Sequence, residues 1–322
     1  MNKLISLKKI TNVMADTSDL DEIQKYRPND VTTNPSSILS FVENKKNDYF
    51  LKTIFHSFDF DNFSRETIGS KLYEIILIRL ASEIVKMIPG RVSIEMNSRF
   101  SYDEENCFEI SKKIIQSLEE EGIKKNRILI KIASTWQGIQ AAKRLEKIGI
   151  NCNLTLIFSF AQAIACADSK VHSISPFVGR ITDWYQNNEN KKKLDDQEDP
   201  GINFVKNIYK YYKSNGFNTN IIGASIRSTK HIFELSGCDY LTIPPQLLQK
   251  LSCSRGEIKR KIIKKTYLNK YQKNEKMTES DFYWKHCSDN MANFSLSNGI
   301  HKFFVDQEKL KRFILNRFYK NF

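Results

Sequence analysis

The sequence has no uninterrupted apolar run close to the roughly 20 residues that span a bilayer, so no membrane-spanning helix is expected. Its beginning, MNKLISLKKITNVMAD, mixes charged and apolar side chains without an apolar signal core. Nothing there indicates export, and we expect a cytoplasmic protein. A long low-complexity linker is also missing. We therefore expect one domain over residues 1–322, with a helical extension over about 250–322.

The six cysteines include no CxxC pair and have no histidine cluster beside them. This spacing argues against a zinc site and against a disulfide framework. We expect free, buried thiols, no bound metal and no other cofactor.

Acidic residues are in the minority, which leaves a net charge of +13 and an isoelectric point near 9.3. The stretch 254–276 contributes +7 of this charge, with nine basic and two acidic residues. It lacks the glycine-rich or aromatic pattern of RNA-binding segments. We interpret it as a solvated, lysine-rich surface and expect no nucleic-acid partner, with a dedicated nucleic-acid patch as the alternative.

Short β-branched runs recur along the chain between longer segments with helical spacing. Eight such runs are expected to be strands: 12–16, 30–34, 91–95, 128–132, 153–157, 172–177, 220–225 and 240–244. Residues 70–88 show the broad apolar face of a helix, and Ser134 or Thr135 can cap the helix that follows the fourth run. A strand followed by a helix, eight times over, predicts an α/β fold, the closed (β/α)8 or TIM barrel.

Two segments are expected to lie outside this repeat. The polar, breaker-rich residues 187–201 predict a surface loop after the sixth strand. The apolar pattern of 301–319 predicts a terminal helix that packs outside the barrel. The barrel is thus expected to carry extra C-terminal helices.

Lys131 lies among isoleucine and leucine residues in RILIKIAST, the fourth run. A buried ammonium is costly unless it is paired, and the alternative is a neutral, nucleophilic amine. Polar residues at strand C-termini of a barrel converge on one mouth, where enzymes of this fold have their sites. Besides Lys131, the candidates at these ends are Asp16, Thr32, Thr33, Asn34, Glu95, Asn153, Thr155, Ser175, Ser225 and Arg227. One strand-end Asp or Asn is commonly a cap or turn residue, so only their joint presence indicates a site.

These residue types suit class I aldol chemistry. A neutral lysine amine attacks a ketone or aldehyde and forms an imine, whose protonated form withdraws electrons from a neighbouring carbon–carbon bond. The accompanying proton transfers require a carboxylate near the imine, and Asp16 and Glu95 are the candidates.

Other members of the set suit a phosphorylated sugar. The amide and hydroxyl groups of Asn34, Asn153 and Ser175 offer the donors and acceptors that polyol hydroxyls need. Arg180 and Arg227, at the later strand ends, can grip a phosphate by forked hydrogen bonds. The set therefore predicts a sugar-phosphate site.

Several stretches are long enough to indicate a family: VMADTSD, DVTTNPS, PGRVSIE, RILIKIASTWQGI, GINCNLTLIFSF, ISPFVGRITDWY, EDPG and GASIR. In this order they resemble the transaldolases, specifically the long bacterial and eukaryotic type. The resemblance runs from about Leu4 to the DQEKLKRF segment near the C-terminus. It implies transfer of a dihydroxyacetone unit from sedoheptulose 7-phosphate or fructose 6-phosphate to glyceraldehyde 3-phosphate or erythrose 4-phosphate, in the non-oxidative pentose phosphate pathway.

The resemblance also implies roles for single residues. Lys131 matches the lysine that forms the Schiff base, and Asp16 matches the acid/base that removes the C4 hydroxyl proton. Glu95 and Thr155 match the pair that positions a water during imine formation and hydrolysis. Substrate contacts are expected from Thr32, Thr33, Asn34, Asn153, Ser175 and Phe177, and phosphate contacts from Arg180, Ser225 and Arg227.

Alternatives remain open from the sequence. Related fructose 6-phosphate aldolases, which release the three-carbon unit, tend to have a tyrosine where this chain has Phe177, so the phenylalanine favours transfer. Lys131 can also be an unreactive lysine paired to Glu95 or Asp16. A catalytically silent, basic barrel that binds RNA is the alternative from a different class. Relatives are often dimers, and the apolar C-terminal helix is a candidate surface for a homodimer.

Overall fold

The computed structural model describes residues 1–58, 63–188, 199–263 and 276–318. Eight parallel strands form a closed barrel, in which neighbours in sequence pair and the first strand also pairs with the last. They are β1 (Asn12–Asp16), β2 (Asp30–Thr32), β3 (Val92–Glu95), β4 (Ile128–Ala133), β5 (Cys152–Ile157), β6 (Ser173–Pro176), β7 (Asn220–Gly223) and β8 (Tyr240–Ile243). All eight predicted strands and the barrel are confirmed.

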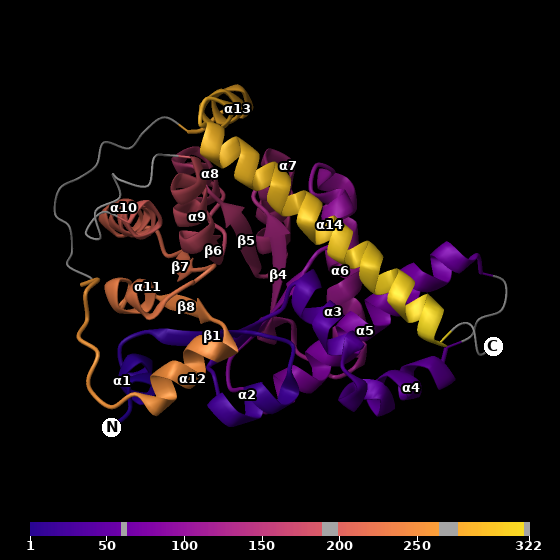
Figure 1. Cartoon of the computed structure of the whole chain (residues 1–322). Coiled ribbons are helices and arrows are strands. Elements are labelled where there is room, and N and C mark those ends of the chain that lie inside the picture. The colour runs from indigo at the N-terminus through magenta and orange to yellow at the C-terminus, as the bar shows by residue number, and fades with distance from the viewer. Residues whose placement is uncertain (59–62, 189–198, 264–275, 319–322) are drawn as a thin grey trace.

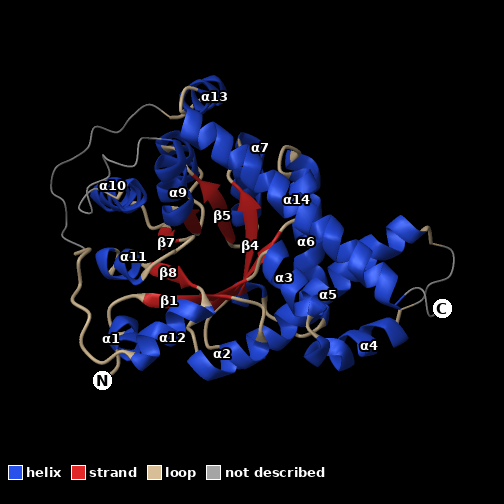
Figure 2. Cartoon of the chain, in the orientation of Figure 1, coloured by secondary structure: helices blue, strands red, loops and turns tan. Residues whose placement is uncertain are grey.

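Figure 2 shows helices around the barrel of strands. They are α1 (Lys3–Lys8), α2 (Leu20–Tyr26), α3 (Pro35–Glu43), α4 (Asp48–His56), α5 (Arg65–Met87), α6 (Glu104–Glu120), α7 (Trp136–Lys147), α8 (Phe160–Asp168), α9 (Val178–Asn188), α10 (Pro200–Ser214), α11 (Thr229–Glu234), α12 (Pro245–Cys253), α13 (Glu279–Cys287) and α14 (Asn290–Phe318). Short 3₁₀ turns are η1 (Lys45–Asn47), η2 (Ser98–Phe100) and η3 (Lys125–Arg127).

Two boundaries correct the sequence predictions. The predicted helix over 70–88 is α5, which starts five residues earlier because Ser64 caps it. The predicted loop over 187–201 overlaps a helix at each end, since α9 extends to Asn188 and α10 begins at Pro200. Residues 189–198 lie outside the described part of the chain, as do 264–275 of the basic stretch.

Polar caps fix the turns that follow the strands. Thr135 caps α7 by accepting a hydrogen bond from the Gly138 N–H at 2.9 Å. Asn34 caps α3 in a reciprocal pair with Ser37, and Pro35 occupies the first helical position. Each helix therefore starts at a defined point beside a strand end, which holds the loops of the barrel mouth in place.

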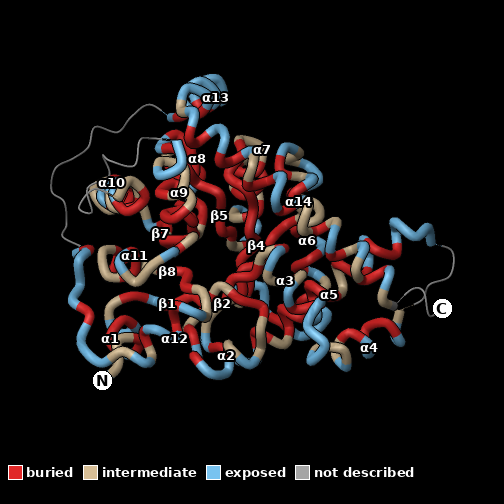
Figure 3. The backbone as a smooth tube through the Cα atoms, viewed as in Figure 1, coloured by how far each residue is buried: buried red, intermediate tan, exposed pale blue. Residues whose placement is uncertain are grey.

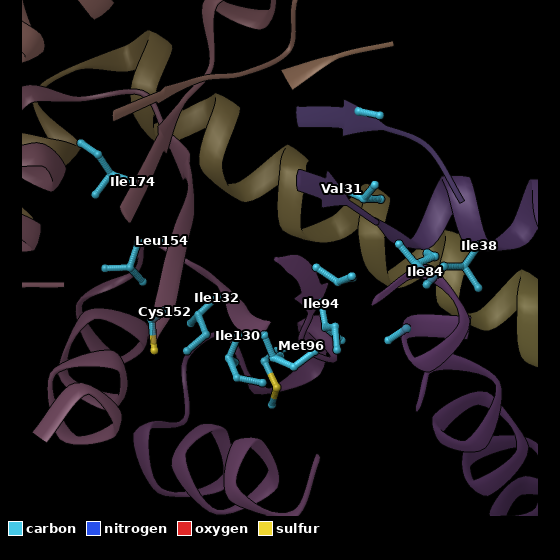
Figure 4. Packing of buried hydrophobic residues seen from close by; sticks show 14 of the residues in the cluster. Val31, Ile38, Ile84, Ile94, Met96, Ile130, Ile132, Cys152, Leu154 and Ile174 are labelled. Atoms are coloured by element: carbon cyan, nitrogen blue, oxygen red, sulfur yellow. The ribbon is translucent and has the colours of Figure 1, made fainter. Parts of the chain in front are cut away.

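Successive side chains of each strand point alternately toward the surrounding helices and into the barrel interior. Figure 4 shows Ile130 and Ile132 of β4 among the packed apolar side chains, with Leu154 of the neighbouring β5. Lys131 lies between these two isoleucines in sequence, so its side chain points the other way, into the barrel. Most strand residues are buried, whereas the outward faces of the helices are exposed (Figure 3).

The long helix α14 runs obliquely across the barrel (Figure 1). It contacts α3, α5 and β5. The sequence predicted a helix over 301–319 outside the barrel, but α14 starts eleven residues earlier and places Phe303 in the cavity described below. The prediction of a terminal helix packed outside the ring of strands is confirmed, whereas its position over the barrel mouth was not predicted.

All six cysteines are free, as predicted, but two are not buried. Cys253 and Cys287 are exposed because each ends a peripheral helix, α12 and α13. Within the described residues, none of the helices combines the length and the apolar character that crossing a bilayer requires.

Candidate active site

The barrel mouth, where the C-terminal ends of the strands lie, contains a cavity of about 190 Å³. Ten predicted site residues line it: Asp16, Thr32, Asn34, Lys131, Thr155, Ser175, Phe177, Arg180, Ser225 and Arg227. Thr33, Glu95 and Asn153 are buried and are not among the lining residues. Strand register explains their proximity, because Lys131 is paired with Glu95 on one side and with Asn153 on the other.

Lys131 forms a buried ion pair in which its Nζ lies 2.7 Å from Oε2 of Glu95. The same Nζ donates a hydrogen bond to the carbonyl oxygen of Thr33 at 3.2 Å. Burial raises the pKa of Glu95, although the Lys131 ammonium opposes this shift. A carboxylate with a raised pKa accepts a proton more readily, so Glu95 is placed to deprotonate the Lys131 ammonium.

Asp16 is held by Asn34, whose Nδ2 donates to Oδ1 of Asp16 at 3.0 Å. The other end of the Asn34 amide accepts the Ser37 N–H, which fixes the orientation of the group. Burial raises the pKa of Asp16, while Lys131, Arg227 and Arg180 oppose the shift by their charge. Asp16 is therefore a carboxylate that can take up and hold a proton beside the cavity.

Hydroxyl and amide groups form a second side of the cavity. Ser175 donates to Oδ1 of Asn153 at 2.7 Å, and Nδ2 of Asn153 donates to Ser93 at 3.0 Å. Asn153 thus supports Ser175 from behind the lining, and its contact with a substrate stays a prediction. Oγ1 of Thr155 is buried and has no hydrogen-bond partner among the described residues. A buried hydroxyl of this kind is suited to a water or to a substrate group.

The guanidinium groups of Arg180 and Arg227 line another part of the cavity. Arg180 lies between the rings of Phe177 and Phe303, at 5.0 and 5.6 Å from their centroids. Burial lowers the pKa of Arg180, and the charge of Arg227 lowers it further. Arg227 is half exposed and pairs with Asp183 at 3.2 Å. Two neighbouring cations, one of them half-buried, favour a bound dianion such as a phosphate ester.

Four lining residues were not predicted from the sequence: Ser36, Ala224, Thr242 and Phe303. Phe303 is the most informative, since its ring centroid lies 5.9 Å from Nζ of Lys131. It comes from α14, far from the strand ends along the sequence. The only signal was the apolar run HKFFV, which predicts a buried helix face but not its position.

Comparison with known proteins gives a consistent result. A model of the transaldolase/fructose-6-phosphate aldolase family matches residues 13–314. The chain belongs to this family. A protein named transaldolase from Photorhabdus laumondii is 46% identical over 320 residues, which cover 97% of this chain and 98% of that protein. Transaldolase A from Pasteurella multocida is 47% identical over 318 residues, which cover 98% and 99%.

Membership of the transaldolase/fructose-6-phosphate aldolase family confirms the resemblance predicted from the sequence. A protein named transaldolase from Glaesserella parasuis matches with 46% identity over 321 residues, which cover 99% of this chain and all of that protein. Both the barrel and its C-terminal helices therefore lie within the matched length. The roles of individual residues stay predictions.

Proposed function

We propose that the chain is a transaldolase that transfers a dihydroxyacetone unit from a ketose phosphate to an aldose phosphate through an imine on Lys131. The buried contact of 2.7 Å between Lys131 and Glu95, at a cavity that also holds Asp16, supports this most strongly. Relatives named transaldolase along nearly the whole chain support it further. Fructose 6-phosphate and sedoheptulose 7-phosphate are the proposed donors, and erythrose 4-phosphate and glyceraldehyde 3-phosphate the proposed acceptors.

The first step is formation of the imine. Glu95 takes a proton from the Lys131 ammonium, and the free amine attacks the keto carbon of the donor. The resulting carbinolamine loses its hydroxyl group as water after protonation. A water bound by Glu95 and the unpartnered hydroxyl of Thr155 carries these protons.

The second step is cleavage of the carbon–carbon bond. Asp16 removes the C4 hydroxyl proton, the C3–C4 bond breaks, and its electron pair moves into the protonated imine. The aldose phosphate leaves as an aldehyde and the three-carbon unit stays on Lys131 as an enamine. The raised pKa of Asp16 lets it keep the proton until an acceptor aldehyde arrives.

Transfer requires that the enamine is not protonated before the acceptor binds. Phe177 and Phe303 both line the cavity, and neither ring carries a hydroxyl group that could relay a proton. The pair Arg180 and Arg227 binds the phosphate of donor and acceptor in turn. Because neither ring relays a proton, the enamine is protonated slowly in the absence of an acceptor. Hydrolysis that would release dihydroxyacetone is therefore slow.

Two assays on the purified protein test this proposal. In the first, fructose 6-phosphate and erythrose 4-phosphate are supplied and sedoheptulose 7-phosphate is measured. In the second, fructose 6-phosphate is supplied alone and free dihydroxyacetone is measured. We expect transfer to be at least about tenfold faster than release. Faster release would make the protein a fructose 6-phosphate aldolase.

The remaining sequence predictions are also part of this proposal. A homodimer is expected, and Phe294 on α14, which is 58% exposed in the single chain, is the candidate contact. Sedimentation that shows only monomers would remove this expectation. A cytoplasmic location is expected as well. Salt-sensitive RNA retention together with no imine formation would favour the basic RNA-binding barrel instead.

A further inference from the structure

The loop 224–228 connects β7 to α11 and presents Ser225 and Arg227 to the cavity. Ser225 adopts a left-handed backbone conformation with φ of 60°, which is unfavourable for a residue with a side chain. The Gly179 N–H donates to the carbonyl oxygen of Ser225 at 2.9 Å. A Cβ atom on Gly179 would lie 2.2 Å from that oxygen, so the loop is pressed against the start of α9. A strained loop of this kind needs further contacts to keep its shape.

His231 supplies such a contact from the first turn of α11. Its Nδ1 accepts a hydrogen bond from the backbone N–H of Arg227 at 3.3 Å. Its Nε2 lies 3.2 Å from Oδ2 of Asp199. Because Nδ1 is an acceptor, the hydrogen of the neutral ring is on Nε2 and is donated to Asp199. The ring is buried, with 5% of its side chain exposed, so water does not replace these bonds.

Asp199 is itself fixed by other elements. Its Oδ1 accepts the Ile202 N–H at 3.0 Å, which caps α10. The same oxygen accepts the hydroxyl of Thr182, on α9, at 2.8 Å. Thr182 lies two residues after Arg180, the second predicted phosphate ligand. The carboxylate of Asp199 therefore links the helix that carries Arg180 to the ring that holds the backbone of Arg227.

We propose that His231 is a positioning residue for phosphate binding, which holds the backbone of Arg227 and thereby places the Arg227 guanidinium and the Ser225 hydroxyl at the cavity. The side chain of Arg227 is half exposed and its pair with Asp183 is screened by solvent. The location of the guanidinium thus depends on the backbone. This inference rests on the proposed function, in which the two arginines bind the substrate phosphate.

Two substitutions test the two hydrogen bonds of the His231 ring one at a time. His231→Asn places an amide oxygen near the position of Nδ1 and keeps an acceptor for the Arg227 N–H. His231→Gln reaches toward Asp199 but loses that acceptor. Both side chains are polar, so neither leaves an apolar group beside Asp199. His172→Gln is the matched control, because His172 directly precedes β6 at the end of the barrel opposite the mouth.

Affinity for inorganic phosphate, measured by calorimetry on the whole protein at pH 7.5, tests the proposal without turnover. We expect His231→Gln to weaken phosphate binding about tenfold, and His231→Asn by less than about threefold. His172→Gln should leave it unchanged. In the transfer assay, His231→Gln should raise KM for fructose 6-phosphate with little change in kcat, since phosphate contacts act equally in the ground and transition states.

Equal phosphate affinities for the wild type and His231→Gln would overturn the proposal. So would equal losses in His231→Gln and His231→Asn, because the Arg227 contact would then not decide affinity. A loss of kcat without a change in KM would also contradict it. If the wild type binds phosphate but shows no transfer activity, the proposed function fails, while the affinities of the two variants still judge the role of His231.

Discussion

The carboxyl group of Asp16 is placed where its charge costs stability. Burial raises its pKa in spite of three nearby cations, so the folded protein binds the proton more tightly than the unfolded chain does. The same property makes Asp16 useful as a proton acceptor that retains its proton. Active-site groups commonly combine reactivity with a cost in stability of this kind.

Asp16→Asn should therefore abolish transfer and raise the thermal midpoint at neutral pH. Below the unfolded pKa of about 3.8, Asp16 is protonated in both states and contributes no difference. As the pH rises through the folded pKa, the wild type loses stability and the variant does not. The difference in midpoint should thus grow with pH, by a few degrees at most. Calorimetric scans between pH 4 and pH 8 would contradict this if the wild type became the more stable protein.

Phe177→Tyr introduces a hydroxyl group that can relay a proton to the enamine. We expect this variant to release free dihydroxyacetone from fructose 6-phosphate at least several-fold faster than the wild type, with transfer reduced. The ring itself should still pack beside Arg180, which lies 5.0 Å from its centroid. Unchanged release would show that the ring is not what protects the enamine.

For single residues, the sequence predicted most of the cavity lining, because the C-terminal ends of successive barrel strands meet at one mouth. Lys131 was identifiable as a cation inside an isoleucine run, and register then brought Glu95 beside it. Phe303 and the buried position of Asn153 were not predictable. Both depend on which atoms face the cavity after helices and strands have packed, and local sequence pattern does not contain that information.

Among the helices, α14 adds Phe303 to the lining of the cavity. Gly299, Phe303 and Gln307 follow one another at four-residue intervals and therefore share a face. Gln307 accepts the backbone N–H and the hydroxyl of Ser98, at 3.2 and 2.7 Å, just after Glu95. Phe303 faces Lys131 and Arg180. The face defined by these three residues joins the helix to the candidate site along about two turns.

Gly299→Ala tests how closely this helix determines the phosphate site. A Cβ atom at Gly299 would lie 3.0 Å from a guanidinium nitrogen of Arg180 and 2.9 Å from Leu156. We expect KM for fructose 6-phosphate to rise severalfold, since Arg180 is displaced. Alanine otherwise favours a helix by up to about 1 kcal/mol, so a loss of affinity without unfolding is the expected result.

Gly69→Ala, in the interior of α5, is the matched control for that variant. Its Cβ atom would lie 3.0 Å from the end of the Leu315 side chain, far along α14 from the cavity. This substitution should leave KM unchanged. If both alanine variants change KM to the same extent, the effect is a general one on helix packing and the assignment of Gly299 fails.

The elements themselves were largely predictable, for reasons that differ along the chain. β-branched runs with polar ends specify strands, and Ser or Thr before an apolar period specifies where helices start, as at Thr135. The path of α14 was not predictable. An amphipathic pattern fixes which face of a helix is buried, but the surface that covers this face is decided by the rest of the fold.

For the whole molecule, a half-buried histidine, His172, and a buried one, His286, set a dependence of stability on pH. Burial lowers the pKa of His172 from 6.5 to about 4, and the charge of Arg91 adds to this shift. Burial also lowers the pKa of His286, which stacks on Phe282 and contacts Ser159. In both cases the unfolded chain takes up the proton first as the pH falls.

The contribution of His172 to stability should therefore be complete above about pH 6.5 and lost as the pH falls toward about 4. Allowing for its partial exposure, we expect a loss on the order of 2 kcal/mol over this range. Urea unfolding at pH 7 and pH 4.5 measures it. His172→Gln should show a smaller loss than the wild type, and an equal loss would assign the effect to other groups.

Trapping of the imine is the most direct test of the central claim, that Lys131 is the nucleophile. The protein is incubated with fructose 6-phosphate, reduced with borohydride and digested, and the peptides are weighed by mass spectrometry. The account predicts that the peptide containing Lys131 gains the mass of a reduced dihydroxyacetone unit, and that a Lys131→Met variant gains none. An unmodified Lys131 peptide from protein that is active in transfer would contradict it.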